Sequence, residues 1–433
     1  MDKLVLYISL IILIVSGCSD DGSTDGGSNQ GTTGDSPNIL LIIADDMGKD
    51  PTSGFPEGIL KANTPHIDSL RDAGLSFSNC WVNPTCSPTR ASILTGKYGY
   101  RTDVKWAGDE LSNDEKSLHT YLKEQGNPDY STALIGKWHL SGNNNNADPE
   151  SYGIDHFAGI PKGGVQDYYN WDLLEDGVNV QMTKYITETF TDLSIDWVSD
   201  QDSPWFLWLA YNAAHTPFHT PPSSMHSQGD LPEYTDDLDP LPYYLAAIEA
   251  MDFQIGRLLG SMTDDVLDNT VIIFIGDNGT PGKVAQSPYS SNTSKGSLYQ
   301  GGVNVPLYLS GHGVDRIGLD DNLINGTDLF STIGQLAGAN ESTIHDSQSF
   351  KPLLTEATTL REYQYAEVRN ENTDQWAISN GKYKLIVDAN RKNELYNLSI
   401  DPTEQNDLNM MGMPTADLNA RNELEEELDR IRN

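Results

Sequence analysis

Two continuous apolar runs constrain the fold of this chain more than any other feature of its sequence. Residues 39–43 and 271–275 contain no polar side chain, and turn-forming residues stand at both ends of each run. A strand without polar alternation is typical of a parallel sheet that is covered on both faces. Residues 132–135 and 205–210 have a similar character. The four runs therefore predict a mostly parallel sheet at the centre of the fold.

Helical patterns lie between these runs, at residues 64–73, 116–125 and 243–262. Strands that alternate with helices form sheets whose faces the helices cover. We therefore expect an α/β fold in which a large mixed, mostly parallel sheet is sandwiched by helices. A chain of 433 residues leaves room for a second, smaller domain with its own core.

The chain changes character after residue 345. Short runs of alternating polarity are separated by Asn, Gly and Asp, which predicts a small antiparallel sheet. These runs are residues 363–369, 375–379, 383–388 and 394–398. Residues 416–431 carry Leu418, Leu424 and Leu428 among many charges, so we expect a terminal amphipathic helix that covers this sheet. The predicted domains are a large α/β domain at 37–345 and a small α+β domain at 346–433.

The N-terminus predicts export and lipid anchoring. The apolar run at residues 4–15 is shorter than the ~20 residues that a membrane-spanning helix needs. Small residues then precede Cys18, which resembles the cleavage box of bacterial lipoproteins. We expect residues 1–18 to be a lipoprotein signal peptide, with Cys18 lipidated and the protein anchored to the cell envelope, on the periplasmic face or the outer surface. The alternative is an ordinary signal peptide with a chance cysteine.

Residues 19–36 consist almost entirely of Gly, Ser, Thr, Asp and Asn, which is typical of a flexible tether. The whole chain carries a formal net charge of −36, from 63 acidic and 27 basic residues. Such a surface repels nucleic acid, so no nucleic-acid partner is expected. An anionic substrate would need a local cationic pocket.

Two pairs of polar residues follow the two clearest strands, and they predict a metal site. Asp45-Asp46 and Asp277-Asn278 stand directly after the apolar runs. Ligands bind beyond the carboxyl ends of parallel strands, and adjacent buried carboxylates repel each other unless a cation lies between them. Oxygen donors alone suit a hard ion, calcium or magnesium. Taken singly, each pair could equally cap a helix or form a turn.

A third motif predicts an anion site around Cys86. Pro88 suits the first turn of a helix, which places Cys86 at a helix N-terminus, where backbone N–H groups favour an anion. Arg90 lies within one turn, and its planar guanidinium suits a tetrahedral oxyanion. The alternative for Cys86 is a disulfide with Cys80 in an oxidising compartment.

The stretch from Cys86 through Pro88 and Arg90 to residues 94–96 resembles the signature of the type I sulfatases, of the alkaline-phosphatase-like superfamily. Further segments resemble the motifs of this family in family order. They are residues 37–46, 136–140, 212–218, 276–279, 295–303 and 394–402. Lys137 and His139 stand two apart, so at a strand end both side chains are expected on one face, toward the metal.

The resemblance implies cofactors and a reaction. Cys86 would be oxidised to formylglycine by a formylglycine-generating maturation enzyme, and the hydrated aldehyde would attack the sulfur of a sulfate ester. One calcium ion would be held by Asp45, Asp46, Asp277, Asn278 and the modified Cys86.

The resemblance also implies a role for each catalytic side chain. His215, with Lys295, would give a proton to the leaving alcohol, and His139 would take a proton from the second hydroxyl of the hydrate. Asp277 would help to deprotonate the attacking hydroxyl. Arg90 and Lys137 would hold the sulfate oxygens.

A lipid-anchored sulfatase is expected to act on a sulfated glycan. Trp106, Tyr168 and Trp171 are candidates for stacking on sugar rings, and the alternative is that the aromatic residues of the loop at 142–171 form its buried core. Two other functions stay open. One is a phosphodiesterase or phosphonate monoester hydrolase of the same superfamily, and the other is a glycan-binding lipoprotein that has lost its chemistry.

Overall fold

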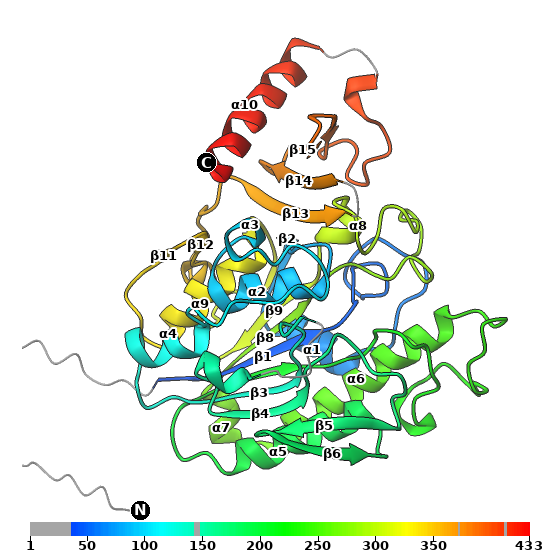
Figure 1. Cartoon of the computed structure of the whole chain (residues 1–433), viewed down its shortest axis with the longest axis vertical. Helices are drawn as coiled ribbons and strands as arrows, with labels where there is room; N and C mark the ends of the chain where they lie inside the picture. The colour runs from blue at the N-terminus through cyan, green and yellow to red at the C-terminus, as the bar shows by residue number, and fades with distance from the viewer. Residues whose placement is uncertain (1–35, 143–147, 371–372, 411–413) are drawn as a thin grey trace, which may run out of the picture. The chain divides into compact units, whose positions relative to one another are not determined.

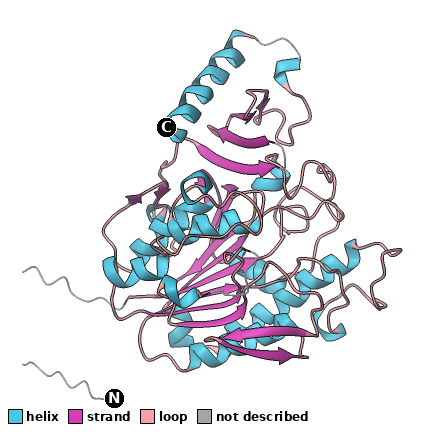
Figure 2. Ribbon diagram, in the orientation of Figure 1, coloured by secondary structure: helices cyan, strands magenta, loops and turns pink. Residues whose placement is uncertain are grey.

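A ten-stranded sheet forms the centre of the computed structural model, which describes residues 36–142, 148–370, 373–410 and 414–433 (Figure 1, Figure 2). The strand order is β10-β2-β9-β8-β1-β7-β3-β4-β5-β6. Its strands are β1 (Asn38–Ala44), β2 (Leu75–Trp81), β3 (Ser131–Lys137), β4 (His156–Ile160), β5 (Trp171–Glu175), β6 (Val178–Met182), β7 (Trp205–Ala210), β8 (Thr270–Gly276), β9 (Leu307–Gly311) and β10 (Gly318–Asn325).

The middle of the sheet is parallel and its margins are mixed. β1 pairs in parallel with β7 and β8, and β3 pairs in parallel with β7 and β4. β9 is antiparallel to β8 and β2, and β5 is antiparallel to β4 and β6. The predicted α/β fold with a mixed, mostly parallel sheet is confirmed.

Helices cover both faces of this sheet. They are α1 (Pro65–Asp72), α2 (Cys86–Thr95), α3 (Gly99–Thr102), α4 (Leu118–Gln125), α5 (Ile186–Ser199), α6 (Leu241–Ser261), α7 (Asp264–Asp268), α8 (Gln300–Val303) and α9 (Leu329–Leu336). Short 3-10 helices are η1 (Pro149–Tyr152), η2 (Ser223–Met225), η3 (Gly326–Asp328), η4 (Lys351–Leu354) and η5 (Leu408–Met410). Among the described helices, none combines the length and the apolar character that crossing a membrane requires.

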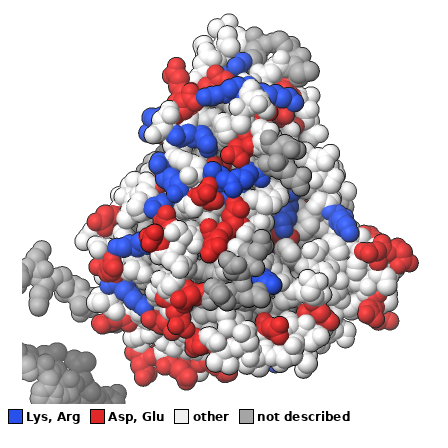
Figure 3. All heavy atoms as spheres, in the orientation of Figure 1, with Lys and Arg blue, Asp and Glu red and all other residues white. Residues whose placement is uncertain are grey.

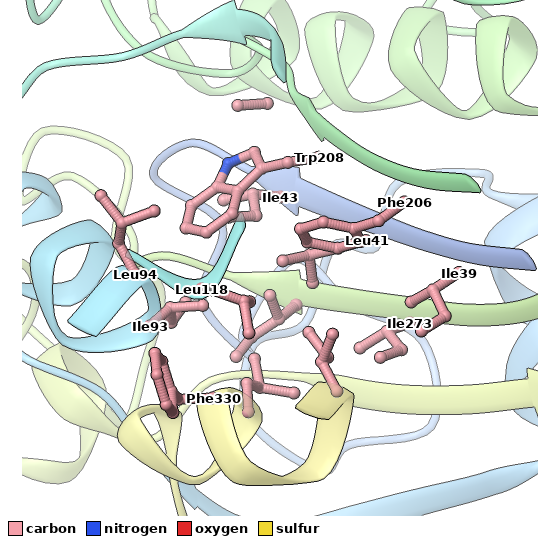
Figure 4. Packing of buried hydrophobic residues seen from close by; sticks show 14 of the residues in the cluster. Ile39, Leu41, Ile43, Ile93, Leu94, Leu118, Phe206, Trp208, Ile273 and Phe330 are labelled. Carbon is pink, nitrogen blue, oxygen red and sulfur yellow. The ribbon is translucent and has the colours of Figure 1, made fainter. Parts of the chain in front are cut away.

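The central strand β1 shows why its sequence has no polar alternation. Ile39, Leu41 and Ile43 face a core formed with α2, α4 and α9, and Figure 4 shows these three side chains in one cluster with Ile93, Leu118 and Ile273. Leu40 and Ile42 face the opposite core, which α1, α5 and α6 cover. Because successive side chains of a strand point to opposite faces, both sets must be apolar when both faces are buried. Each such side chain contributes about 1.5–3 kcal/mol of burial free energy.

A second, four-stranded sheet lies near the C-terminus. Its strands are β13 (Gln364–Asn370), β14 (Thr373–Ser379), β15 (Tyr383–Asp388) and β16 (Asn393–Asn397), and all neighbouring pairs are antiparallel. The terminal helix α10 (Thr415–Arg432) packs Leu424 and Leu428 against Leu385 of this sheet. Leu418 is exposed instead, because Ala420 of the buried face stands only two residues away, on a different side of the helix.

The residues just after 345 belong to the larger core. The short ladder of β11 (Thr343–Ile344) and β12 (Ser347–Gln348) spans this point, and Phe350, Leu353 and Leu354 pack with the core beneath α9. By packing, therefore, the small domain begins near β13. The described part of the chain from Ser36 onward forms one compact unit, while the predicted signal peptide and Cys18 lie outside the described residues, as does the tether up to residue 35.

Hydrogen bonds from β13 join the small sheet to the large sheet. The Gln364 side-chain amide donates hydrogen bonds of 2.8 Å to backbone carbonyls of β2 and β10. Further along the strand, Arg369 donates its backbone N–H to the Lys105 carbonyl at 3.0 Å and pairs its guanidinium with Asp103 at 3.0 Å. The loop that contains Lys105 is thus held by the small sheet.

Candidate active site

The two predicted acidic pairs meet at the carboxyl edge of the large sheet. Ala44 of β1 is paired in register with Gly276 of β8, so the residues that follow each strand must be neighbours. The Asp46 backbone N–H donates to the Asp277 carboxylate at 3.1 Å. All four polar side chains of the two pairs are buried. The sheet register alone therefore creates a buried cluster of three carboxylates and one amide.

Each carboxylate has one cationic partner. Lys137 Nζ lies 2.5 Å from Asp45 Oδ2, and Lys295 Nζ lies 2.5 Å from Asp46 Oδ1. Arg90 places Nη2 2.7 Å from Asp277 Oδ2. These are three pairs of one acid and one base, so the six charges balance when all three carboxylates are ionised.

The helix α2 positions Cys86 and Arg90, as its sequence predicts. Cys86 is the first residue of this helix, and its Sγ lies 3.2 Å from His139 Nδ1. Burial raises the pKa of the Cys86 thiol, although Lys137 opposes the shift. An unmodified Cys86 is therefore protonated and a poor nucleophile at neutral pH. Cys80 and Cys86 are both free thiols, so the alternative of a disulfide between them is wrong.

His139 reaches the site by a different route from the predicted one. β3 ends at Lys137, and His139 has a φ of 60°, in the left-handed region. Its backbone N–H donates to the Pro161 carbonyl at 3.1 Å. Lys137 and His139 do share the site, but strand alternation is not the reason. The backbone bond to the segment after β4 orients the imidazole.

His215 stands on a loop that is hydrogen-bonded to the end of β1. The Asp45 N–H donates to the Ala213 carbonyl at 3.1 Å, and the Ala214 N–H donates to the Asp45 carbonyl at 2.8 Å. His215 Nε2 then lies 3.9 Å from Asp46 Oδ2. Burial lowers the pKa of His215 to about 4, with Asp46 opposing this shift. Its Nδ1 lies 2.7 Å from the Thr216 carbonyl, which can only accept, so Nδ1 carries a proton.

The buried oxygens of this cluster fit a hard divalent cation. Asp45 Oδ1 and Asn278 Oδ1 are buried and have no hydrogen-bond partner. One ligand atom each from Asp45, Cys86 and Asp277 lie within 4.8 Å of one another. Burial raises the pKa of Asp45 to about 8, Lys137 opposes the shift, and Asp277 and Asp46 add to it. A carboxylate that is costly to ionise, beside unused oxygens, is what a cation site presents without its ion.

The three candidate sugar-stacking residues differ in exposure. Tyr168 and Trp171 are buried, so their rings are not free to stack on a sugar, and the structure favours the alternative of a buried loop core. Tyr168 instead donates its hydroxyl hydrogen to the carbonyls of Asn212, at 2.8 Å, and His215, at 2.6 Å. Trp106 is 40% exposed. Its loop is attached to the site because the Gly108 N–H donates to Ser87 Oγ at 2.9 Å.

Three further residues support the site, although the sequence did not single them out. Ser87 Oγ donates to the His139 carbonyl at 2.9 Å, and Tyr244 donates its hydroxyl hydrogen to the Asp46 carbonyl at 2.7 Å. Gly163 lies against the His139 ring so closely that a methyl group there would stand 2.2 Å from Nε2. A Gly-Gly pair that begins three residues after the end of β4 is the local signal, and it marks a close backbone approach.

The structure thus gathers the predicted catalytic and metal-binding residues around one buried cluster, and their individual roles stay predictions. Comparison with known proteins gives the family. The family model described as Sulfatase matches residues 37–339, which is most of the chain. The chain belongs to the sulfatase family.

Relatives of this sulfatase come from both bacteria and animals. A sulfatase of Formosa agariphila is 27% identical, and the alignment covers 93% of this chain and 88% of that protein. The uncharacterized sulfatase YdeN of Escherichia coli is 28% identical over 68% of this chain, and the matched region spans 61% of the YdeN length. The crystal structure of Ps i-CgsB with k-i-k-neocarrahexaose superposes with a TM-score of 0.77 at 25% identity, covering 91% of this chain and 92% of that chain. The predicted family is confirmed.

Proposed function

We propose that this protein hydrolyses sulfate esters of a carbohydrate, using formylglycine made from Cys86 and one calcium ion. The charge balance of the site carries this proposal. Three carboxylates face three cationic side chains, so a bound divalent cation would give the site a net charge of about +2, and a sulfate monoester carries a single negative charge. The site would then be complementary to its anionic substrate.

The chain as a whole has the opposite charge, although Figure 3 shows Lys and Arg side chains over the upper half of one face. The chain carries a formal net charge of −36. On the face shown in Figure 3, acidic side chains gather along the lower edge and over the segment that precedes α6. A sulfated substrate is therefore attracted only locally, because the bulk surface repels it.

The metal and the modified residue would each supply one piece of chemistry. Asp45, Asp46, Asp277 and Asn278 would hold the calcium ion, which would polarise a sulfate oxygen, and the aldehyde hydrate at position 86 would supply the attacking hydroxyl. Arg90 is held in place by Asp277 and by the Lys137 carbonyl at 2.8 Å, so its guanidinium is oriented before a substrate arrives. Such preorganised donors stabilise charge that develops during reaction.

Proton transfer would fall to the two histidines and Lys295. His139 Nδ1, at 3.2 Å from the sulfur of residue 86, is placed to take a proton from a group at that position. His215 Nε2 and Lys295 Nζ both face Asp46 on the opposite side of the carboxylate cluster. Asp46 raises the pKa of Lys295 against the opposing effect of burial, so Lys295 is an ammonium ion. Lys295 would give a proton to the leaving alcohol. His215 would share this role only as an imidazolium ion, with a second proton on Nε2 that the bound anionic ester would stabilise.

The likeness to Ps i-CgsB, whose structure was determined with a neocarrahexaose, supports a carbohydrate substrate. The N-terminal sequence supports a place of action outside the cytoplasm. Residues 1–18 would direct export, lipid on Cys18 would anchor the protein to the cell envelope, and residues 19–36 would hold the enzyme away from the membrane. The partners would be a sulfated glycan, the membrane and the formylglycine-generating maturation enzyme.

The test combines the modification with the reaction. Protein produced together with the maturation enzyme should yield a residue-86 peptide about 18 Da lighter than its cysteine form. It should release sulfate from sulfated oligosaccharides, and a Cys86→Ala variant should not. Hydrolysis of a phosphodiester or phosphonate ester without sulfate release would favour the other hydrolases of the superfamily. Glycan binding without hydrolysis by the modified protein would favour a binding protein.

A further inference from the structure

A cavity of about 450 Å³ lies beside the catalytic cluster, between the segment that follows β4 and the hairpin of β5 and β6. This volume falls within the ~300–1,000 Å³ of small-molecule sites. Its lining includes Lys162, Gly164, Asn170, Trp171, Asp172 and Asn179. None of these residues takes part in the chemistry proposed above.

The cavity adjoins His215 with only a glycine between them. Gly164 lines the cavity, and a methyl group at Gly164 would stand 3.4 Å from His215 Nδ1 and Cε1. Tyr168, in the same loop, donates its hydroxyl hydrogen to the His215 carbonyl at 2.6 Å. The wall of the cavity and the proposed proton donor are therefore joined by direct contacts. A ligand group that reaches past Gly164 from the cavity arrives at His215.

The side chains of the cavity suit a sugar. Side-chain amides offer both donors and acceptors, which is what the hydroxyl groups of a sugar ring need. The Asn170 carboxamide is already oriented, because Gln181 Nε2 donates to its oxygen at 2.9 Å. The amino group of Asn170 is then directed for donation to a ligand. Trp171 lines the cavity and is held by a 2.9 Å hydrogen bond from its Nε1 to the Lys184 carbonyl.

Lys162 adds a positive charge at this site. Its side chain is exposed and lines the cavity, and it has no acidic partner within salt-bridge distance among the described residues. Asp172 also lines the cavity but lies beyond salt-bridge distance of Lys162, so the ammonium group is free to pair with an anionic group of a ligand.

We propose that this cavity binds the neighbouring sugar of an oligosaccharide whose sulfated sugar lies at the catalytic cluster, and that Lys162 pairs with an anionic group, sulfate or carboxylate, on that neighbour. The proposal rests on the proposed sulfatase activity and adds its substrate class. The enzyme would prefer an oligosaccharide with an anionic sugar next to the cleaved ester over an isolated sulfated monosaccharide.

The test compares KM values across four substrates. The first two are 4-nitrophenyl sulfate and a sulfated monosaccharide. The other two are sulfated disaccharides, prepared from carrageenan or glycosaminoglycans, one with a neutral neighbouring sugar and one with an anionic neighbouring sugar. A partly exposed ion pair is worth ~0.2–1 kcal/mol, so Lys162→Gln should raise KM about 1.4- to fivefold for anionic neighbours only. Asn170→Ala should raise KM for both kinds of disaccharide by about three- to tenfold, the loss of one hydrogen bond. Neither variant should change kcat/KM for 4-nitrophenyl sulfate.

Lys392→Gln is the matched control, because Lys392 is an exposed lysine in the turn between β15 and β16. It should leave all four KM values unchanged. Equal losses on the aryl sulfate and the disaccharides, or unchanged KM values in both cavity variants, would overturn the subsite. Failure of the wild type to cleave any sulfate ester would instead reject the proposed function. In that case calorimetric titration of the protein with the two disaccharides still tests the subsite, because Lys162→Gln must weaken binding of the anionic disaccharide.

Discussion

Replacing Gly163 by alanine should cripple catalysis while leaving the fold intact. The added methyl group would stand 2.2 Å from Nε2 and 2.3 Å from Cε1 of His139. Ordinary contact between such atoms is about 3.5 Å, so the ring must retreat by about 1.3 Å, the difference between about 3.5 Å and 2.2 Å. The ring has little room to do so, because its Nδ1 already lies 3.2 Å from Cys86 Sγ. A misplacement of about 1 Å costs on the order of 100-fold in rate, or about 2.7 kcal/mol of transition-state stabilisation.

The assay is the steady-state hydrolysis of 4-nitrophenyl sulfate, with the modified fraction of residue 86 and the melting temperature measured on the same samples. Gly163→Ala should lower kcat about 100-fold. Gly260→Ala is the control, since Gly260 lies in α6 with no atom within 4 Å of an added methyl group. The control should retain full activity and gain about 0.5–1 kcal/mol of stability from its better helix propensity. Wild-type kcat in Gly163→Ala, with equal modification, would refute the reasoning about His139.

Three further perturbations test other parts of the site and the fold. Exhaustive chelation should abolish hydrolysis and lower the melting temperature, because Asp45 and Asp277 then repel each other. Added calcium should restore both the activity and the melting temperature. Unchanged activity after chelation would reject the metal site. His215→Ala should lower the rate about 10²–10⁴-fold on sugar sulfates but much less on aryl sulfates, because the leaving groups of aryl sulfates need no proton. Equal losses on both kinds of substrate would make His215 a positioning residue. Burial lowers the pKa of His119, whose ring nitrogens have no hydrogen-bond partner, to about 3. Unfolding therefore takes up a proton between about pH 3 and 6.5, so stability should fall with decreasing pH by up to about 1.4 kcal/mol per unit. Melting curves of His119→Phe should show a flatter dependence, and an identical slope would contradict this.

Features of the fold that depend on local sequence pattern, or on which residues follow a strand, can be predicted from the sequence. The run at 39–43 is uniformly apolar because both faces of β1 are buried, and this property is visible without coordinates. The acidic pairs follow two strands that turn out to be adjacent, so the position of the carboxylate cluster could be predicted from the ends of the strands. The Cys86 helix begins where Pro88 and the motif place it.

The sequence predicts poorly what depends on contacts between distant segments. The pairing of Lys137 with Asp45 and of Lys295 with Asp46 joins residues 92 and 249 positions apart, which no local pattern encodes. Tyr168 and Trp171 have the composition of a sugar-binding loop, but packing decides that their rings are buried. His139 lies in the site because of a backbone bond to Pro161, and strand alternation was the wrong reason.

Because of the way the small C-terminal sheet is attached, two properties of the enzyme can vary independently: the shape of the entrance to the site and the catalytic cluster itself. Arg369 of β13 holds the loop of Lys105, and that loop ends at Gly108, which contacts Ser87 next to Cys86. The carboxylates and histidines, in contrast, are held by the large sheet, by the loops at its carboxyl edge and by α6, through the hydrogen bonds described above. Divergence of the C-terminal sequence could therefore remodel the entrance around Trp106, and with it the choice of glycan, in a lineage whose bond-breaking apparatus stays unchanged. Exchanging residues from β13 onward between relatives would be a direct route to sulfatases with new preferences.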